Sequence, residues 1–214
     1  MSSRDHRYLA GGVGGAVIFF VGLFLELPML QLVTKAVPVL VLALWLRPWR
    51  HRETQLLAAG LLLSAIGDLC LQVSPTLFVA GLVAFLLAHL AYLAAFVGRT
   101  RRGSIVIAVP VALFGISTFL WLQPSLGAMS SPVLAYVVVI CMMLWRAWAQ
   151  VGDTDVPRAT AWTAALGATS FAVSDTLVAY NRFIEPVLVL QVPLMLLYWM
   201  GQWGIAASTL RRTT

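Results

Sequence analysis

Clusters of proline, glycine and arginine divide the chain into long apolar segments, and this alternation limits the fold more than any other feature. Eight segments are about 20 residues long, enough for an α-helix to cross the ~30 Å hydrocarbon core of a bilayer. They are residues 8–26, 30–47, 54–73, 77–98, 104–122, 132–150, 160–180 and 187–208. A membrane-spanning β-strand would instead alternate polar and apolar residues. We therefore predict an all-α polytopic membrane bundle of eight transmembrane helices.

Composition supports this class of protein. Of the 214 residues, 61% are hydrophobic and 10% are charged, whereas a soluble domain is about 45–50% apolar and about 25% charged. The connections between the segments are too short to separate domains. We predict a single integral-membrane domain over residues 1–214.

Basic residues fall on alternate connections, which predicts the orientation of the chain. Of the 14 lysines and arginines, 12 lie in the terminal tails or in or beside the even-numbered connections: Arg4, Arg7, Arg47, Arg50, Arg52, Arg99, Arg101, Arg102, Arg146, Arg158, Arg211 and Arg212. Cytoplasmic loops carry such an excess. We expect a multi-pass protein of the bacterial inner membrane with both termini in the cytoplasm. Topology thus accounts for the net charge of +6, and we expect no nucleic-acid partner.

Asp68 and Asp175 lie 107 residues apart, half the length of the chain. With this offset Gly60 aligns with Gly167, and Ala65 with Ala172. The sequence therefore leaves open two parallel four-helix halves. Gly11 and Gly15 form a small-xxx-small pair, which favours close packing within the bundle over dimerisation. We expect a monomer or a weak homodimer.

Ionisable residues interrupt several apolar segments. They are Glu26, Lys35, Asp68, His89 and Asp175. A charged group at the bilayer centre costs about 2.5–3.5 kcal/mol even on the lenient insertion scale, so some interaction or function must offset it. Serine or asparagine would join helices at lower cost. The two deep aspartates therefore favour a functional role.

Polar residues follow single faces of the predicted helices. The sets are Gly60, Ser64, Asp68 and Gln72; Phe85, His89, Tyr92 and Phe96; Thr163, Gly167, Ser170, Ser174 and Asn181, with Asp175 on the flank; and Gln191, Met195, Tyr198 and Gln202. Residues spaced by three or four share one helix face, and such faces turn inward in a membrane bundle. We predict one interior polar pocket that at least four helices line.

Each of the other polar residues also has a structural interpretation. Glu26 and Lys35 can extend to the membrane surface, and His89 can be a hydrogen-bonded packing residue. Tyr198 and Gln202 can join helices. Three histidines and no metal-binding motif predict no metal and no cofactor.

The sequence resembles the YhhN-type membrane family, whose animal members include lysoplasmalogenases. Five segments carry the resemblance over nearly the whole chain: "TKAVPVL" from Thr34, "GDLCL" from Gly67, "AHLAYLAAF" from Ala88, "SDTLVAYNRF" from Ser174 and "YWMGQWGI" from Tyr198. Each segment is weak alone, and their order and spacing make the set specific.

This resemblance implies a hydrolase that cleaves the vinyl-ether bond of a lysoplasmalogen to a fatty aldehyde and glycerophosphoethanolamine or glycerophosphocholine. It maps the essential aspartates of the family onto Asp68 and Asp175. Acid/base catalysis by two carboxyl groups suits this reaction, as in glycoside hydrolysis. The lysophospholipid substrate would contact further residues of the polar faces and their surroundings: Lys35, His89, Tyr92, Asn181, Tyr198, Gln202, Glu26 and Ser64.

A proton-coupled transporter of a small molecule or lipid is the alternative, and a non-catalytic lipid-binding protein is a third possibility. Paired intramembrane carboxylates also occur in carriers, which break helices at matched positions in both halves. We expect Pro38 and Pro110 to interrupt the predicted second and fifth helices, and Pro193 to break the eighth. Their positions do not match, which favours the enzyme.

Overall fold

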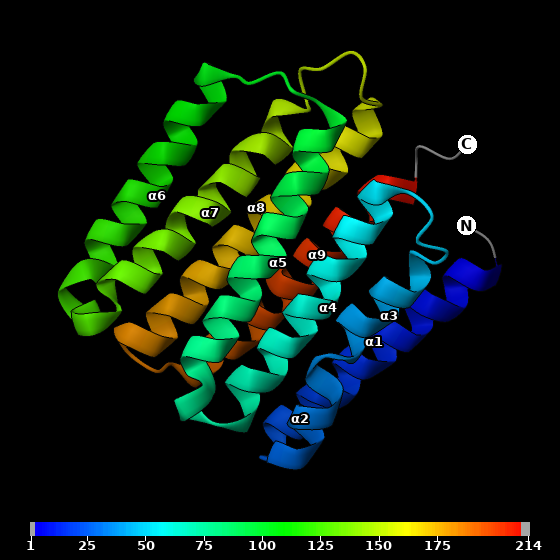
Figure 1. Ribbon diagram of the computed structural model, residues 1–214. Helices are drawn as coiled ribbons and strands as arrows, with labels where there is room; N and C mark the ends of the chain where they lie inside the picture. Colours follow the sequence, from blue (N-terminus) through cyan, green and yellow to red (C-terminus); the bar gives the residue numbers. More distant parts are fainter. Residues whose placement is uncertain (1–2, 211–214) are drawn as a thin grey trace. The chain divides into compact units, whose positions relative to one another are not determined.

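The protein is described by a computed structural model over residues 3–210, and this range contains helices and no strand. The long helices are α1 (Ser3–Phe24), α4 (Arg52–Val73), α5 (Phe78–Arg99), α6 (Ile105–Leu126), α7 (Ser130–Ala149), α8 (Arg158–Phe183) and α9 (Gln191–Leu210). The short ones are α2 (Pro28–Lys35), α3 (Val37–Trp45) and the 3₁₀ turns η1 (Pro75–Leu77), η2 (Gly127–Met129) and η3 (Leu188–Leu190). Figure 1 shows their order along the chain. Arg211 and Arg212, which contribute to the predicted orientation, lie outside the described residues.

The all-α prediction is confirmed for the described residues, whereas the count of eight membrane spans stays a prediction. Six stretches of these residues are long and apolar enough to cross a membrane. One of them, Ile105–Ala149, contains both α6 and α7. The 26-residue α8 is not among the six. It is also the helix that carries Asp175.

The predicted second helix, over residues 30–47, is interrupted before Pro38, and the interruption expected at this proline is confirmed. α2 ends at Lys35 and α3 begins at Val37, with Pro38 in its first turn. Proline has no amide hydrogen and its ring displaces the preceding turn, so the ladder of hydrogen bonds cannot continue past this point. Lys35 therefore lies at a helix C-terminus, where a positive charge is favourable.

Pro110 and Pro193, the other two prolines expected to break helices, interrupt none. α6 continues through Pro110. Pro193 lies in the first turn of α9, where an amide hydrogen has no partner within the helix anyway. The predictions that Pro110 interrupts the fifth helix and that Pro193 breaks the eighth were therefore wrong.

Two compact units divide the chain within α5, after Ala91. In the first unit α1 packs on α2 and α3, and both of these pack on α4. A Cβ atom at Gly15 would lie 2.6 Å from Val37, and one at Gly11 would lie 3.9 Å from Val41. The small-xxx-small pair of α1 therefore packs against α3 within one chain. Gly67 allows an equally close approach of α4 to the ring of Phe85 on α5, at 2.6 Å.

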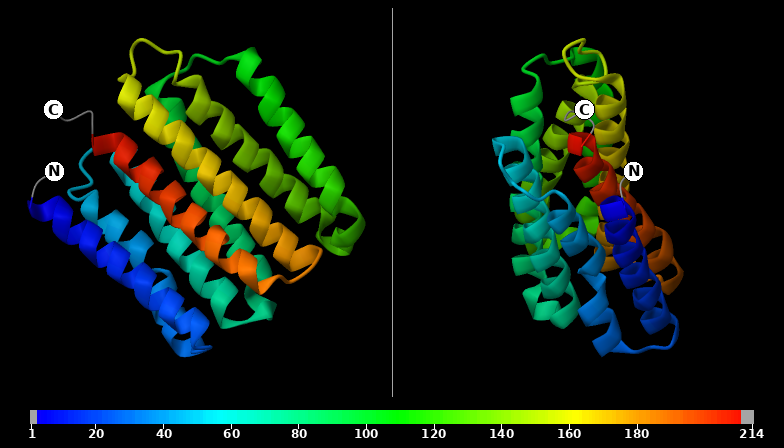
Figure 2. Two further views of the ribbon diagram at one scale, coloured as in Figure 1. Left: turned by 180° about the vertical axis from the view of Figure 1, so that it is seen from behind. Right: turned by 90° about the vertical axis from the view of Figure 1, so that its right-hand side faces the viewer.

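In the second unit α8 packs most extensively on α9, and the two run side by side in both views of Figure 2. Three glycines bring the two backbones together. A Cβ atom at Gly167 would lie 2.7 Å from the backbone nitrogen of Ile205, and one at Gly204 would lie 2.7 Å from the Cα atom of Gly167. At Gly201 the nearest atom would be the backbone nitrogen of Phe171, at 2.8 Å. α6 and α7 complete this unit, with α7 packed on α8.

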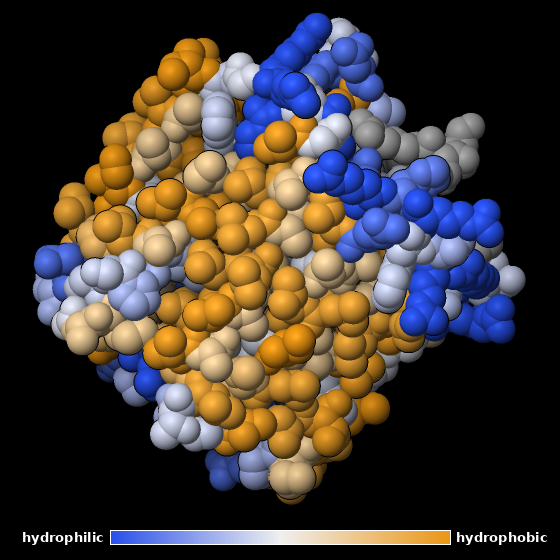
Figure 3. All heavy atoms as spheres, in the orientation of Figure 1, coloured by the Kyte–Doolittle hydropathy of each residue, from blue (hydrophilic) through white to orange (hydrophobic). Residues whose placement is uncertain are grey.

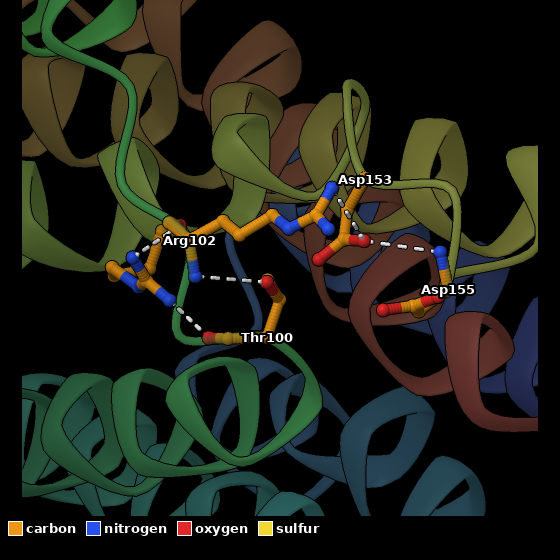
Figure 4. Close-up of polar contacts among 5 residues, drawn as sticks. Thr100, Arg102, Asp153 and Asp155 are labelled. Carbon is orange, nitrogen blue, oxygen red and sulfur yellow. Dashed lines mark hydrogen bonds and ion pairs between the residues drawn. The ribbon is translucent and has the colours of Figure 1, made fainter.

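Polar contacts join the α5–α6 loop of this unit to the end of α7 and the α7–α8 loop (Figure 4). Arg146 of α7 is buried, and its guanidinium donates to the carbonyl groups of Thr100 and Arg102. Asp153 lies 3.8 Å from Arg102 and accepts from the amide of Asp155 at 3.0 Å. These contacts give hydrogen-bond partners to backbone groups of the two loops.

Asp153 gives these contacts a pH dependence. Its pKa is held below the usual value of 3.8, chiefly by the Thr100 hydroxyl, then by the Asp155 amide and the charge of Arg102. A carboxyl group whose pKa is lower in the folded state stabilises the protein fully at a pH above its pKa in the unfolded state. This stability is lost as the pH falls through its pKa in the folded state. We expect Asp153→Asn to lower the melting temperature at pH 7. The difference from wild type should shrink as the pH falls below 3.8. Asp155→Asn is the control, and an equal loss there would contradict this role.

Candidate active site

Asp68 is buried in the first unit, with only 2% of its surface exposed. It lies on α4 one turn after Ser64, which is fully buried, and the inward face predicted for this helix is confirmed. Lys35, at the end of α2, interacts electrostatically with Asp68. The sequence suggested both residues separately but not this pairing. The interruption after Lys35 ends the helix next to the buried carboxyl group.

A second polar pair lies one helical turn away. Gln72 of α4 donates to the side-chain oxygen of Gln31 on α2 at 3.3 Å. Gln31 in turn donates to the carbonyl of Gly22 on α1 at 3.1 Å. Gln31 lies four residues before Lys35 on α2, and Gln72 lies four residues after Asp68 on α4. Both pairs therefore lie on the facing sides of these two helices. The glutamines therefore fix the spacing of the helices that carry the charged pair. Sequence reasoning missed Gln31.

His89 is also buried in the first unit. Its Nδ1 lies 2.7 Å from the carbonyl oxygen of Phe85, one turn earlier on α5. A carbonyl only accepts, so Nδ1 carries the hydrogen in this contact and the tautomer is fixed. Glu26, by contrast, is exposed in the turn between α1 and α2, with φ of 53°. Its proposed contact with substrate stays a prediction.

Asp175 lies on α8 in the second unit and is half-buried. The hydroxyl of Tyr136, on α7, donates to its Oδ2 atom at 2.5 Å. The neighbouring Ser174 donates to the carbonyl of Leu194 at 2.9 Å, which joins α8 to α9. Sequence reasoning missed Tyr136. The available signal was a single hydroxyl within the apolar run of residues 132–145.

Buried aromatic residues lie one turn before Asp175. Phe171 shares the α8 face of Asp175 at a spacing of four residues. Its ring contacts Tyr198 and Tyr92, with centroid distances of 5.4 and 6.4 Å. Tyr92 donates to the side-chain oxygen of Gln202 at 2.6 Å. The predicted inward faces of α5 and α9 are confirmed by this burial.

Two buried amide groups of the second unit keep donor capacity. The Nε2 atom of Gln202 and the Nδ2 atom of Asn181 have no hydrogen-bond partner among residues 3–210. Asn181 uses its oxygen to accept from the amide of Val187 at 3.1 Å, which fixes the loop after α8. Asn181 thus makes one structural contact and has a spare donor, and its contact with substrate stays a prediction. Gln202 likewise joins α9 to α5 and can still donate.

The two aspartates have different surroundings. Asp68 has a positive partner, whereas Asp175 accepts from a neutral hydroxyl. Such a difference is what separates a general acid from an ionised carboxylate in enzymes that use two carboxyl groups. No group of three or more His, Cys, Asp or Glu side chains within residues 3–210 is placed to hold a metal ion.

The sequence is similar to a known family and to curated enzymes over most of its length. A model of the YhhN family matches residues 30–209. Lysoplasmalogenase TMEM86B of Homo sapiens is 36% identical over 179 residues, which cover 83% of this chain and 74% of the human protein. The Lysoplasmalogenase of Mycobacterium bovis is 35% identical over 166 residues, or 73% of this chain and 58% of that protein. Lysoplasmalogenase TMEM86A of Bos taurus is 36% identical over 163 residues, covering 74% of this chain and 66% of its own length. No solved structure matches.

Proposed function

The chain belongs to the YhhN family, and from this we propose that it is a membrane lysoplasmalogenase that cleaves the vinyl-ether bond of a lysophospholipid. Curated relatives of this name in mammals and mycobacteria support the reaction. The six apolar stretches support a location in the bilayer, where such a substrate resides. The observation that carries most weight is the burial of Asp68 beside Lys35.

The proposed reaction is hydrolysis by acid and base. A carboxylic acid protonates the β-carbon of the vinyl ether, and the electron pair of the double bond forms the new C–H bond. The resulting oxocarbenium ion is stabilised by the second, ionised carboxylate. Water adds to its carbon and yields a hemiacetal, which collapses to a fatty aldehyde and the free hydroxyl of the glycerophosphoethanolamine or glycerophosphocholine. General acid–base assistance contributes about 10²–10⁴-fold.

We assign the two roles from the surroundings of each carboxyl group. Lys35 favours an ionised Asp68, which suits the stabilisation of a cation. Tyr136 occupies Oδ2 of Asp175, which leaves Oδ1 as the atom that carries the proton. Lys35 has three N–H donors and can contact the substrate phosphate as well as Asp68. His89, Tyr198 and the spare donor of Gln202 are proposed to orient the lipid.

The direct test uses purified protein in detergent with lysoplasmenylethanolamine, followed by measurement of free aldehyde. The saturated alkyl-ether analogue is the substrate control, because it lacks the double bond that accepts the proton. Aldehyde from the vinyl ether alone supports the proposal. Absence of aldehyde from a folded, monodisperse protein would contradict it.

A carrier is the second candidate, because the α2–α3 interruption lies beside the half-buried Lys35 and the buried Asp68. Carriers form their sites from such interrupted helices. Reconstituted vesicles distinguish the two functions. A carrier would take up substrate with protons and release no aldehyde, whereas the enzyme would release aldehyde without needing a proton gradient.

Tyr136 is proposed to position Asp175, and we expect Tyr136→Phe to lower kcat about tenfold or more with little change in KM. As Asp175 gives up its proton it becomes a carboxylate, and a hydrogen bond to a charged group contributes about 1.5–3 kcal/mol. The Tyr136 hydroxyl therefore acts on the reacting carboxyl group and not on substrate binding. Tyr180→Phe is the matched control, because the Tyr180 ring stacks on Trp121 and the substitution keeps that contact. A KM effect alone would contradict the positioning role.

A further inference from the structure

An apolar groove lies between α6 and α7 in the second unit, and neither Asp175 nor Tyr136 is among the residues that line it. Its volume is about 380 Å³, within the range of about 300–1,000 Å³ typical of ligand sites. Small side chains form part of its lining, among them Ala108, Ala112 and Gly115, and larger ones such as Leu120 and Met142 complete it. Figure 3 shows that apolar side chains cover much of the molecular face turned to the viewer.

One end of the groove reaches the basic loop between α5 and α6. Trp145 lines the groove and donates through Nε1 to the carbonyl of Ser104 at 2.9 Å. Just before Ser104 the loop carries Arg101 and Arg102, both exposed, with 66% of the Arg102 side chain accessible. The groove is therefore apolar along its length and has cationic groups at one end.

Arg146 adds a buried positive charge at the same end. Its guanidinium carbon lies 5.5 Å from the centre of the Trp145 ring. Its terminal nitrogens donate to neutral carbonyl groups, and its Nε atom has no hydrogen-bond partner among the described residues. Asp153 faces Arg102 and offsets one charge. Arg101 and Arg146 leave this end positive.

We propose that the groove binds one acyl chain of an anionic bilayer glycerophospholipid, with the lipid phosphate at the Arg101–Arg102 loop. The length agrees: Ala108 to Leu120 spans about 18 Å of helix, close to the half-thickness of the ~30 Å hydrocarbon core. Cationic groups at one end match a lipid whose charge is at one end of its chain. Basic sites between transmembrane helices bind anionic head groups in this way. The site does not depend on the proposed enzymatic function.

The experiment measures lipid binding to the purified, delipidated protein by native mass spectrometry in detergent. Phosphatidylglycerol and phosphatidylcholine with identical acyl chains are titrated separately. We expect phosphatidylglycerol to bind about fivefold or more tightly than phosphatidylcholine, since each basic residue near an anionic lipid contributes about that factor. Equal binding of the two lipids would overturn the proposal.

Two matched pairs of variants distinguish binding of the acyl chain from binding of the lipid phosphate. Ala112→Trp fills the groove and should lower the affinity for both lipids about tenfold or more. That loss corresponds to about two methylene groups of the acyl chain that are no longer buried. Leu113→Trp is its control, because Leu113 is 59% exposed on α6 and does not line the groove. Arg101→Gln should lower the affinity for phosphatidylglycerol about fivefold and leave that for phosphatidylcholine unchanged. Arg158→Gln, at the start of α8, should change neither affinity.

The proposal is overturned if the two variants of either pair bind the lipids with equal affinity. If Ala112→Trp fails to fold, as its melting temperature would reveal, Val138→Phe fills the groove from α7 and replaces it. Aldehyde release from lysoplasmenylethanolamine is measured in parallel. Loss of lipid binding with retained aldehyde release separates this site from the proposed active site.

Discussion

Replacement of either aspartate by asparagine is expected to lower aldehyde release by about 10²–10⁴-fold, the contribution of general acid–base catalysis. Asparagine has nearly the same shape and removes the ionisable proton. If both aspartates serve one chemical step, the double variant should be no slower than the worse single variant, because groups that act as a unit are strongly non-additive. Asp155→Asn, on an exposed loop carboxylate, should keep wild-type turnover.

The two variants should differ in stability. Asp175→Asn should keep the melting temperature, because the neutral amide has nearly the shape of the protonated carboxyl group and its oxygen can still accept from Tyr136. Asp68→Asn leaves Lys35 without its counter-charge and should lower the melting temperature. Lys35→Met in the same chain should restore it. If either folded asparagine variant released aldehyde at the wild-type rate, the aspartate replaced in it would not be catalytic.

The largest loss of stability is expected from Gly167→Val. A Cβ atom there would lie 2.7–2.9 Å from backbone atoms of Gly204 and Ile205, and backbone cannot rotate away as a side chain can. Overpacking costs about 1–3 kcal/mol where side chains can adjust, so we expect the upper end of this range or more. The corresponding fall in melting temperature is about 6–12 °C, measurable by intrinsic fluorescence in detergent.

Gly98→Val is the matched control for this prediction. Gly98 also lies within a helix of the second unit, and a Cβ atom there would meet no heavy atom within 4 Å. Its melting temperature should stay within about 1–2 °C of wild type, because surface substitutions change stability by about 0.5 kcal/mol or less. Similar losses at both positions would show that α8 and α9 do not depend on the glycine contact.

Periodicity was sufficient to predict which faces of the helices are buried. Asp68, Ser64, Tyr198 and Gln202 were all placed on inward faces by spacings of three and four residues, and each is buried. This works because a continuous helix converts sequence spacing directly into direction. The same geometry fails at Ala36, where Pro38 interrupts the ladder and the register of the second helix is lost.

Contacts between distant segments could not be predicted in this way. The pairing of Lys35 with Asp68 depends on how α2 packs against α4, and that of Tyr136 with Asp175 on how α7 packs against α8. Tyr136 also lacks a polar neighbour on its own helix, so no stripe marked it. The convergence of Asp68 and Asp175 on one substrate stays a prediction, for which the double variant is the test.

The contact between Arg146 and the α5–α6 loop also has a consequence for biosynthesis. Arg146 follows Arg102 by 44 residues, and ribosomes add about 5–20 residues per second. The carbonyl groups of Thr100 and Arg102 therefore wait about 2–9 s for their permanent donor at this elongation rate. During that interval Arg146 cannot bind them, so a nascent chain that stalls before α7 should be cut by proteases in this loop faster than the finished protein is.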